Sequence, residues 1–136
     1  MPVRVLSHTA DSGIEATASS FGDLVGELLR GMFSLIASPE PCAASRWIAA
    51  HVESQSREDL VVDMLSELLY HSEVEDLLFC DFEVVVGPGD GSVDVRAGGI
   101  PYDTVDVSGP PIKAVTYHGL VVEQREEWYA RVYFDV

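Results

Sequence analysis

Apolar residues recur at three- and four-residue spacing in two stretches of the chain, which is the period of one face of an α-helix. The first stretch follows Ser20, a residue type that caps helix N-termini, and stops at Ser38-Pro39. The second follows Ser56, with Asp59 three residues later. The apolar positions are Leu24, Val25, Leu28, Leu29, Met32, Phe33 and Ile36, then Leu60, Val61, Met64, Leu65, Leu68 and Leu69. The spacing predicts two amphipathic helices.

Shorter segments rich in β-branched and aromatic residues indicate strands, separated by glycine and proline. Gly87-Pro88-Gly89-Asp90-Gly91 predicts a hairpin turn, and Gly98-Gly99 is expected to break the strand that follows it. The predicted strands are residues 3–6, 13–18, 45–53, 79–86, 92–97, 112–122 and 128–134, with an irregular loop from Gly99 to Pro111. In the last strand, Trp128, Ala130, Val132 and Phe134 are expected to share one face.

Helices and strands in mixed order predict an α+β fold, a single-domain sandwich of largely antiparallel strands with two main amphipathic helices. The 136 residues are expected to form one domain, 1–136. No apolar run approaches the roughly 20 residues that cross a bilayer, and the first residues are too polar for a signal peptide. Cys42 and Cys80 have no metal-type spacing, so we expect reduced thiols in a cytoplasmic protein.

The chain is strongly acidic. Its 8 Lys and Arg residues against 23 Asp and Glu residues give a formal net charge of −15. Nucleic-acid affinity comes largely from basic residues that neutralise phosphates, so this composition disfavours stable, direct binding of RNA. It fits a basic protein partner or a divalent cation, and it fits solubility alone equally well.

Acidic groups near both ends of the chain are candidate metal ligands. Asp135 directly follows the last predicted strand, Val136 carries the terminal carboxylate, and Asp11 lies in a polar turn between the first two strands. If these groups meet, a hard divalent cation would relieve their repulsion, because Ca²⁺ and Mg²⁺ prefer oxygen ligands. The alternatives are that Asp135 is a solvated surface acid and that Asp11 accepts backbone N–H groups in an Asx-turn.

Lys113 and two histidines are further candidates. Lys113 could pair with Asp135, reach a phosphate, or be an ordinary strand-edge lysine. His8 and His118 could be ligands, proton carriers or hydrogen-bonded structural residues. Together with Asp11 they could form the site of a small metal-dependent phosphoester hydrolase. The glycine-rich turn opens no helix, and no serine lies in a nucleophile elbow, so other catalytic patterns are missing from the sequence.

Three segments resemble the archease family. They are His8-Thr9-Ala10-Asp11-Ser12-Gly13-Ile14, Ile112-Lys113-Ala114-Val115-Thr116-Tyr117-His118, and Phe134-Asp135-Val136 after Trp128. The resemblance spans essentially the whole chain. It departs in the loop: Asp103 matches the loop Asp, but Ile100-Pro101-Tyr102 stands where family members commonly have Gly-Glu, and Val107 or a neighbour replaces a histidine.

The resemblance implies a cytoplasmic accessory protein that is not itself an enzyme. Its partner would be the GTP- and metal-dependent RNA-splicing (tRNA) ligase, whose guanylylation and multiple turnover it promotes. The resemblance also implies a divalent metal ion (Ca²⁺, Mg²⁺ or Mn²⁺) near Asp11, Asp135 and Val136, and a role of Lys113 in activation. Some family members have been linked to a tRNA methyltransferase as chaperones, which keeps a second partner open.

Overall fold

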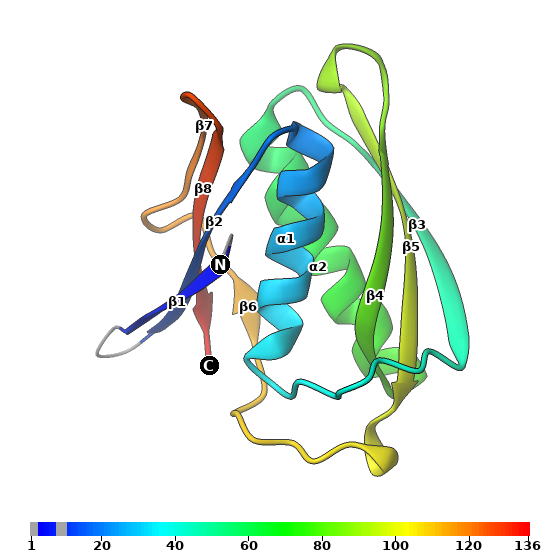
Figure 1. Cartoon of the computed structure of the whole chain (residues 1–136). Coiled ribbons are helices and arrows are strands. Elements are labelled where there is room, and N and C mark those ends of the chain that lie inside the picture. Colours follow the sequence, from blue (N-terminus) through cyan, green and yellow to red (C-terminus); the bar gives the residue numbers. More distant parts are fainter. Residues whose placement is uncertain (1–2, 8–10) are drawn as a thin grey trace.

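Two helices form the middle layer of the molecule, between two antiparallel β-sheets (Figure 1). The computed structural model describes residues 3–7 and 11–136, with the side chains of all of these except Ser7 and Asp11. Helix α1 spans Phe21–Ser34 and helix α2 spans Arg57–Glu75. In the described part of the chain every strand pairing is antiparallel. The predicted α+β sandwich is therefore confirmed.

The first sheet joins the two ends of the chain. Its strands are β1 (Val3–Ser7), β2 (Asp11–Ala18), β6 (Ala114–Val115), β7 (Val121–Gln124) and β8 (Trp128–Asp135). The order is β1-β2-β8-β6, and β7 also pairs with β8. Strand β8 therefore lies between the start of the chain and the late segment that carries Lys113.

The second sheet has the order β3-β5-β4. Its strands are β3 (Arg46–Glu53), β4 (Leu77–Val86) and β5 (Ser92–Pro101), and the short 3-10 helix η1 (Pro88–Asp90) makes the turn between β4 and β5. The hairpin predicted at the glycine-rich turn is confirmed. A second 3-10 helix, η2 (Tyr102–Thr104), opens the loop that leads to β6.

Both helices begin at the predicted caps. The backbone N–H of Asp23 donates to Ser20 Oγ, and that of Asp59 donates to Ser56 Oγ, each over 3.1 Å. These bonds satisfy N–H groups that have no partner inside the helix. At the other end of α2, Asp76 adopts a left-handed conformation with φ 55°, which turns the chain into β4.

The core lies between the helix layer and the two sheets. The alternation expected in the last strand is confirmed, since Trp128, Ala130, Val132 and Phe134 are all buried. On the other side, the Phe33 ring of α1 lies 5.5 Å from Phe79 and 6.0 Å from Phe82, both of β4. Helix α2 buries apolar residues over most of its circumference because elements of both sheets cover it.

The prediction that Gly98-Gly99 breaks a strand is wrong, because β5 continues through both residues to Pro101. A Cβ atom on Gly98 would lie 2.8 Å from the Trp47 ring, and one on Gly99 would lie 3.0 Å from the Leu78 carbonyl oxygen. The two glycines thus allow neighbouring groups to approach the strand closely, and their place in the sequence does not reveal this.

The long strand predicted at residues 112–122 is also wrong. The segment forms two short strands, β6 and β7, with a turn at Gly119, whose φ is 65°. Such a backbone conformation favours glycine. Both short strands pair with β8, so the predicted β character of this segment is confirmed, whereas the turn within it was not predicted.

The expectation of reduced thiols is contradicted by a disulfide between Cys42 and Cys80. The cysteines are 38 residues apart in sequence, but their Cα atoms lie 5.9 Å apart, within the range that a disulfide spans. Packing of α1 on β4 brings the segment after α1 against β4.

No described helix combines the length and the apolar character needed to cross a membrane.

Candidate metal and activation site

Asp135 is the last residue of β8 and has a predicted site residue on each side. In the strand register its Cα partner in β2 is Asp11, and its partner in β6 is Ala114, next to Lys113. The backbone N–H of Lys113 donates to the Asp135 carbonyl oxygen over 2.8 Å. The sheet therefore gathers Asp11, Lys113 and Asp135, which are far apart in sequence, at one end of the molecule.

The Asp135 side chain is directed away from the core. Phe134 is fully buried against the helix layer, and consecutive strand residues face opposite sides of a sheet, so exposed Asp135 lies on the outer face. Val136 follows with 36% of its surface exposed. Asp11 occupies the paired position on β2, and its side chain lies outside the described residues.

The strand register bears on the predicted divalent-cation site, because it pairs Asp135 with Asp11. Paired residues of adjacent antiparallel strands have Cα atoms about 4.5–5.5 Å apart, so the backbones of Asp11 and Asp135 lie next to each other. The predicted ligands are oxygens of Asp135, Asp11 and Val136, and oxygen ligands suit Ca²⁺ or Mg²⁺ better than a thiol-seeking metal. Among the described side chains, no three of His, Cys, Asp and Glu group closely enough to hold a metal, and the predicted set depends on Asp11.

Lys113 is exposed and lines a hollow of about 250 Å³ together with residues of α2. Within the described part of the chain, none of the ion pairs includes Lys113, so its link to Asp135 runs through the backbone alone. The Lys113 ammonium group is thus directed to solvent, where it can meet a phosphate or an acidic group of another molecule.

Of the two candidate histidines, only His118 is among the residues that the structure describes. His118 is exposed in the turn between β6 and β7, with its ring 6.5 Å from that of Tyr133. His8 lies outside the described residues, so the arrangement of a His8, Asp11 and His118 hydrolase site stays a prediction. Asp103, the loop acid, is exposed in η2.

Two polar clusters were missed by the sequence reasoning. His51 lies between Asp94 and Glu53 on the second sheet, with Nδ1 2.7 Å from the Asp94 carboxylate. Elsewhere, the buried Ser72 hydroxyl donates to the Leu77 carbonyl oxygen over 2.5 Å and lies 3.0 Å from the Tyr102 hydroxyl. Burial raises the pKa of Tyr102. Neither cluster has a short sequence motif, because its members come from different elements.

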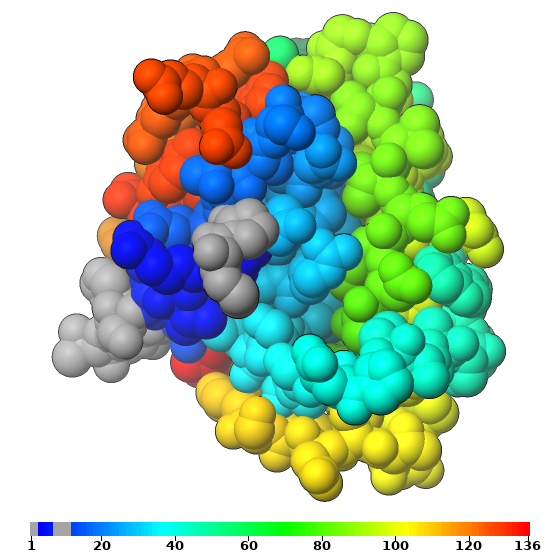
Figure 2. All heavy atoms as spheres, in the orientation of Figure 1, coloured from blue at the N-terminus to red at the C-terminus, as the bar shows by residue number. Residues whose placement is uncertain are grey.

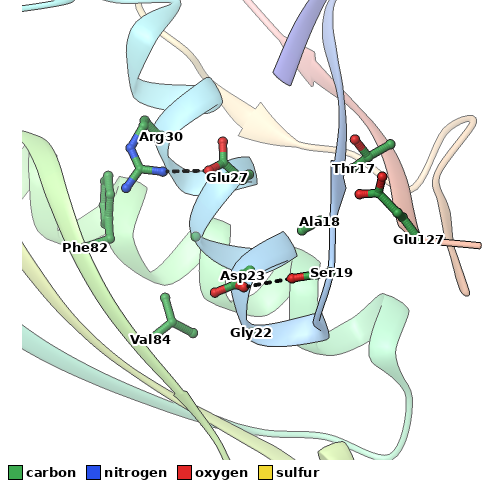
Figure 3. A pocket seen from close by; sticks show the side chains of 11 residues that line it. Thr17, Ala18, Ser19, Gly22, Asp23, Glu27, Arg30, Phe82, Val84 and Glu127 are labelled. Atoms are coloured by element: carbon green, nitrogen blue, oxygen red, sulfur yellow. Dashed lines mark hydrogen bonds and ion pairs between the residues drawn. The ribbon is translucent and has the colours of Figure 1, made fainter. Parts of the chain in front are cut away.

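A hollow of about 670 Å³ lies away from the candidate site, between α1, the end of β2 and β4. Helix α1 reaches the surface between the first sheet and β4 (Figure 2). Polar side chains that line this hollow pair with each other, Arg30 with Glu27 and Ser19 with Asp23 (Figure 3). No described buried polar side-chain atom lacks a hydrogen-bond partner.

Comparisons with known proteins agree over the whole chain. The model of the archease protein family matches residues 4–136. The chain is 31% identical to protein archease of Methanopyrus kandleri over the full length of both. It is 33% identical to protein archease of Methanosarcina mazei, covering 96% of this chain and 93% of that protein.

Two solved structures share the fold. The solution structure of a protein from Methanobacterium thermoautotrophicum superposes with a TM-score of 0.82 at 23% identity, covering 99% of each chain. The crystal structure of an archease from Thermotoga maritima, described as a possible chaperone, gives a TM-score of 0.67 at 18% identity, covering 96% of this chain and 94% of that one.

Proposed function

Because this chain belongs to the archease family, we propose that it is an accessory protein of the RNA-splicing ligase and promotes guanylylation and multiple turnover of that enzyme. The observation that carries the proposal is the meeting of Asp11, Lys113 and Asp135 at one end of the first sheet. In this proposal the chain performs no reaction of its own and acts on its partner.

The proposed site binds Ca²⁺, Mg²⁺ or Mn²⁺ through Asp11, Asp135 and an oxygen of Val136. A divalent cation bound there would supply positive charge that stabilises negative charge on phosphoryl oxygens. Asp135 is held in place by its backbone hydrogen bonds within the sheet, so its carboxylate is presented from a rigid strand rather than from a loop. Lys113, on the adjacent segment, would contact a phosphate of the nucleotide at the ligase.

Charge supports docking to the partner. With a net charge of −15 the chain is repelled by RNA and attracted to a basic protein surface, which raises the rate of productive encounter. The same charge supports the second candidate, a chaperone of a tRNA methyltransferase, since a strongly acidic protein keeps a basic client in solution. The Thermotoga maritima relative is described as a possible chaperone.

The test is multiple-turnover RNA ligation by the cognate ligase with GTP and Mn²⁺, with and without this protein. We expect the protein to raise turnover, and Asp135→Ala and Lys113→Ala each to reduce turnover toward the level without the protein. Asp81→Ala removes an exposed acid of β4, on the other sheet, and should activate like the original chain. Equal activation by Asp135→Ala and the original chain would refute the role of the site.

Two further results would separate the alternatives. No effect on ligation, together with metal-independent protection of a methyltransferase from aggregation, would favour the chaperone function. Release of phosphate from a phosphoester by this protein alone, lost in His118→Ala, would favour the hydrolase.

Metal binding has its own readout. Ca²⁺ at about 100 times its dissociation constant should stabilise the fold by about 2.7 kcal/mol, and a thermal unfolding scan would show this as a higher Tm. Asp135→Ala should lose the increase, whereas Asp81→Ala should keep it. An equal increase in both variants would place the ion elsewhere.

A further inference from the structure

Two neighbouring hollows form a groove along the C-terminal half of α2, beside Lys113. One part, of about 250 Å³, lies between α2 and residues 113–115. The other, of about 360 Å³, lies between the end of α2 and the loop from Val107 to Ile112. Leu69 and Glu73 line both parts, so the two lie side by side, and we call them together the α2 groove.

Apolar side chains stand exposed around this groove. Tyr70 is 59% exposed and Val107 is 53% exposed, and both line the groove. Val74, one helical turn after Tyr70, is 60% exposed. Exposed apolar side chains that gather around one hollow are typical of a surface that another molecule covers.

The walls of the groove are fixed by hydrogen bonds. The Tyr102 hydroxyl lies 3.0 Å from Ser72 Oγ, which ties the start of the loop to α2. Further along, the backbone N–H groups of Ser108 and Gly109 both donate to the Ile36 carbonyl oxygen. A Cβ atom on Gly109 would lie 1.7 Å from the Leu35 carbonyl oxygen, so only glycine fits there. A preformed groove costs little ordering entropy when a partner binds.

The loop also connects the groove to the candidate site. It leaves the end of β5, passes beneath the helices and continues into β6 (Figure 1). Lys113 therefore lies both at the edge of the groove and next to Asp135. A molecule that occupied the groove would be held beside the site proposed for activation.

The charges around the groove select the occupant. Glu73 and Asp76 line it, Asp103 and Asp106 are exposed in the loop, and Lys113 is its one basic lining residue among those described. Phosphates of a nucleic acid would be repelled by these acids. A second copy of this chain would bring another net charge of −15. A basic protein segment with an apolar side chain matches both the charge and the exposed apolar residues.

We propose that the α2 groove is the docking surface for a short basic segment of the ligase, in which one apolar side chain enters beside Leu69 and Lys or Arg side chains pair with Glu73 and Asp76. This inference rests on the proposed function and adds to it the surface that holds the partner. The residues that line the groove do not include the proposed metal ligands Asp11, Asp135 and Val136. Affinity for the ligase and activation of the ligase can therefore be measured separately.

The test is the dissociation constant between this full chain and the cognate ligase, measured by isothermal titration calorimetry. Glu73→Lys reverses a groove charge and Tyr70→Ala removes an exposed aromatic side chain, and each is expected to raise the Kd about tenfold or more, as central interface residues do. Glu126→Lys, an equal charge reversal in the β7–β8 turn, is the matched control and should leave the Kd unchanged. Thermal unfolding of each variant checks that the fold is kept.

The outcomes distinguish the docking surface from the proposed function. If the original chain activates the ligase and the groove variants bind with unchanged Kd, the docking surface is wrong and the activation proposal stands. If the original chain neither binds nor activates the ligase, both are overturned. A third outcome is that the ligase does not bind, the chain associates with itself, and Glu73→Lys abolishes this self-association. That result would assign the groove to a second copy of the chain and overturn the inference.

Discussion

At the scale of single residues, His51 shows how the fold gives a side chain properties that its sequence neighbours do not explain. Asp94, its register partner on β5, and Glu53, two residues along β3, both contact the imidazole. Hydrogen bonds from the ring to Asp94 and then to Glu53 raise the pKa of His51 above its ordinary value of 6.5. The protonated form is therefore favoured in the folded state.

This gives a prediction with a definite sign. Because the folded-state pKa is higher than the unfolded one, the stabilisation by His51 is fully present below about pH 6.5 and is lost as the pH rises through the raised value. His51→Gln should lower Tm at about pH 5.5 and change it less at about pH 8. The effect is small, since the group is solvent-exposed. Thermal scans at both pH values measure this change in Tm. The control is His118→Gln, which replaces another exposed histidine. An equal change at both pH values would contradict the prediction.

At the scale of elements, the helix caps are the strongest local signals in the chain. Ser20 and Ser56 were predicted as N-caps from residue type and spacing, and both accept the expected backbone N–H group. A cap bond forms within four residues, so it needs no information from distant parts of the chain. The strand ends lack such local signals, and the two errors at Gly98-Gly99 and residues 112–122 occur there.

Ser56→Ala should destabilise the protein by about 1 kcal/mol, because the Asp59 N–H group would lose its acceptor. Ser66→Ala, at an exposed position inside the same helix, is the control and should be neutral or slightly stabilising, since alanine has the higher helix propensity. Urea unfolding with unchanged m-values measures the difference. A loss as large in Ser66→Ala as in Ser56→Ala would show that the cap bond is not the cause.

At the scale of the whole molecule, the Cys42–Cys80 disulfide joins the segment after α1 to β4. The two residues are separated by 38 positions. Closing a loop of that length restricts the unfolded chain and corresponds to about 4 kcal/mol in the chain-entropy treatment. The bond thus adds to the packing of α1 on the second sheet as a source of stability.

The double variant Cys42→Ser and Cys80→Ser tests how much the disulfide stabilises the protein. Its free energy of unfolding should be lower by about 2–4 kcal/mol than that of the oxidised protein. Dithiothreitol should lower Tm of the original chain toward that of the variant and leave the variant itself unchanged. An original chain whose Tm is insensitive to reductant would show that the bond contributes no net stability.

Some features of the candidate site could be predicted from the sequence, and others depend on how distant segments pair. Asp11, Lys113, Asp135 and Val136 could be nominated from residue type, position and a family resemblance. Whether Asp11 and Asp135 lie side by side depends on the register between β2 and β8, which is set by pairing over the full length of both strands. The α2 groove could not be predicted from the sequence, because its lining comes from the segment after α1, from α2, from η2, from the loop and from β6.

The sequence by itself determined what depends on short-range chemistry: two capped amphipathic helices, the glycine-rich hairpin, the alternation of β8, the acidic charge and the family. Only the tertiary structure decided the paths of residues 98–101 and 112–122, the disulfide, the environment of His51 and the meeting of Asp135 with Lys113. The reason is physical: helix caps and periodicity act over a few residues, whereas strand register, close approach at glycine and cysteine proximity are fixed by packing between segments that lie far apart in the chain.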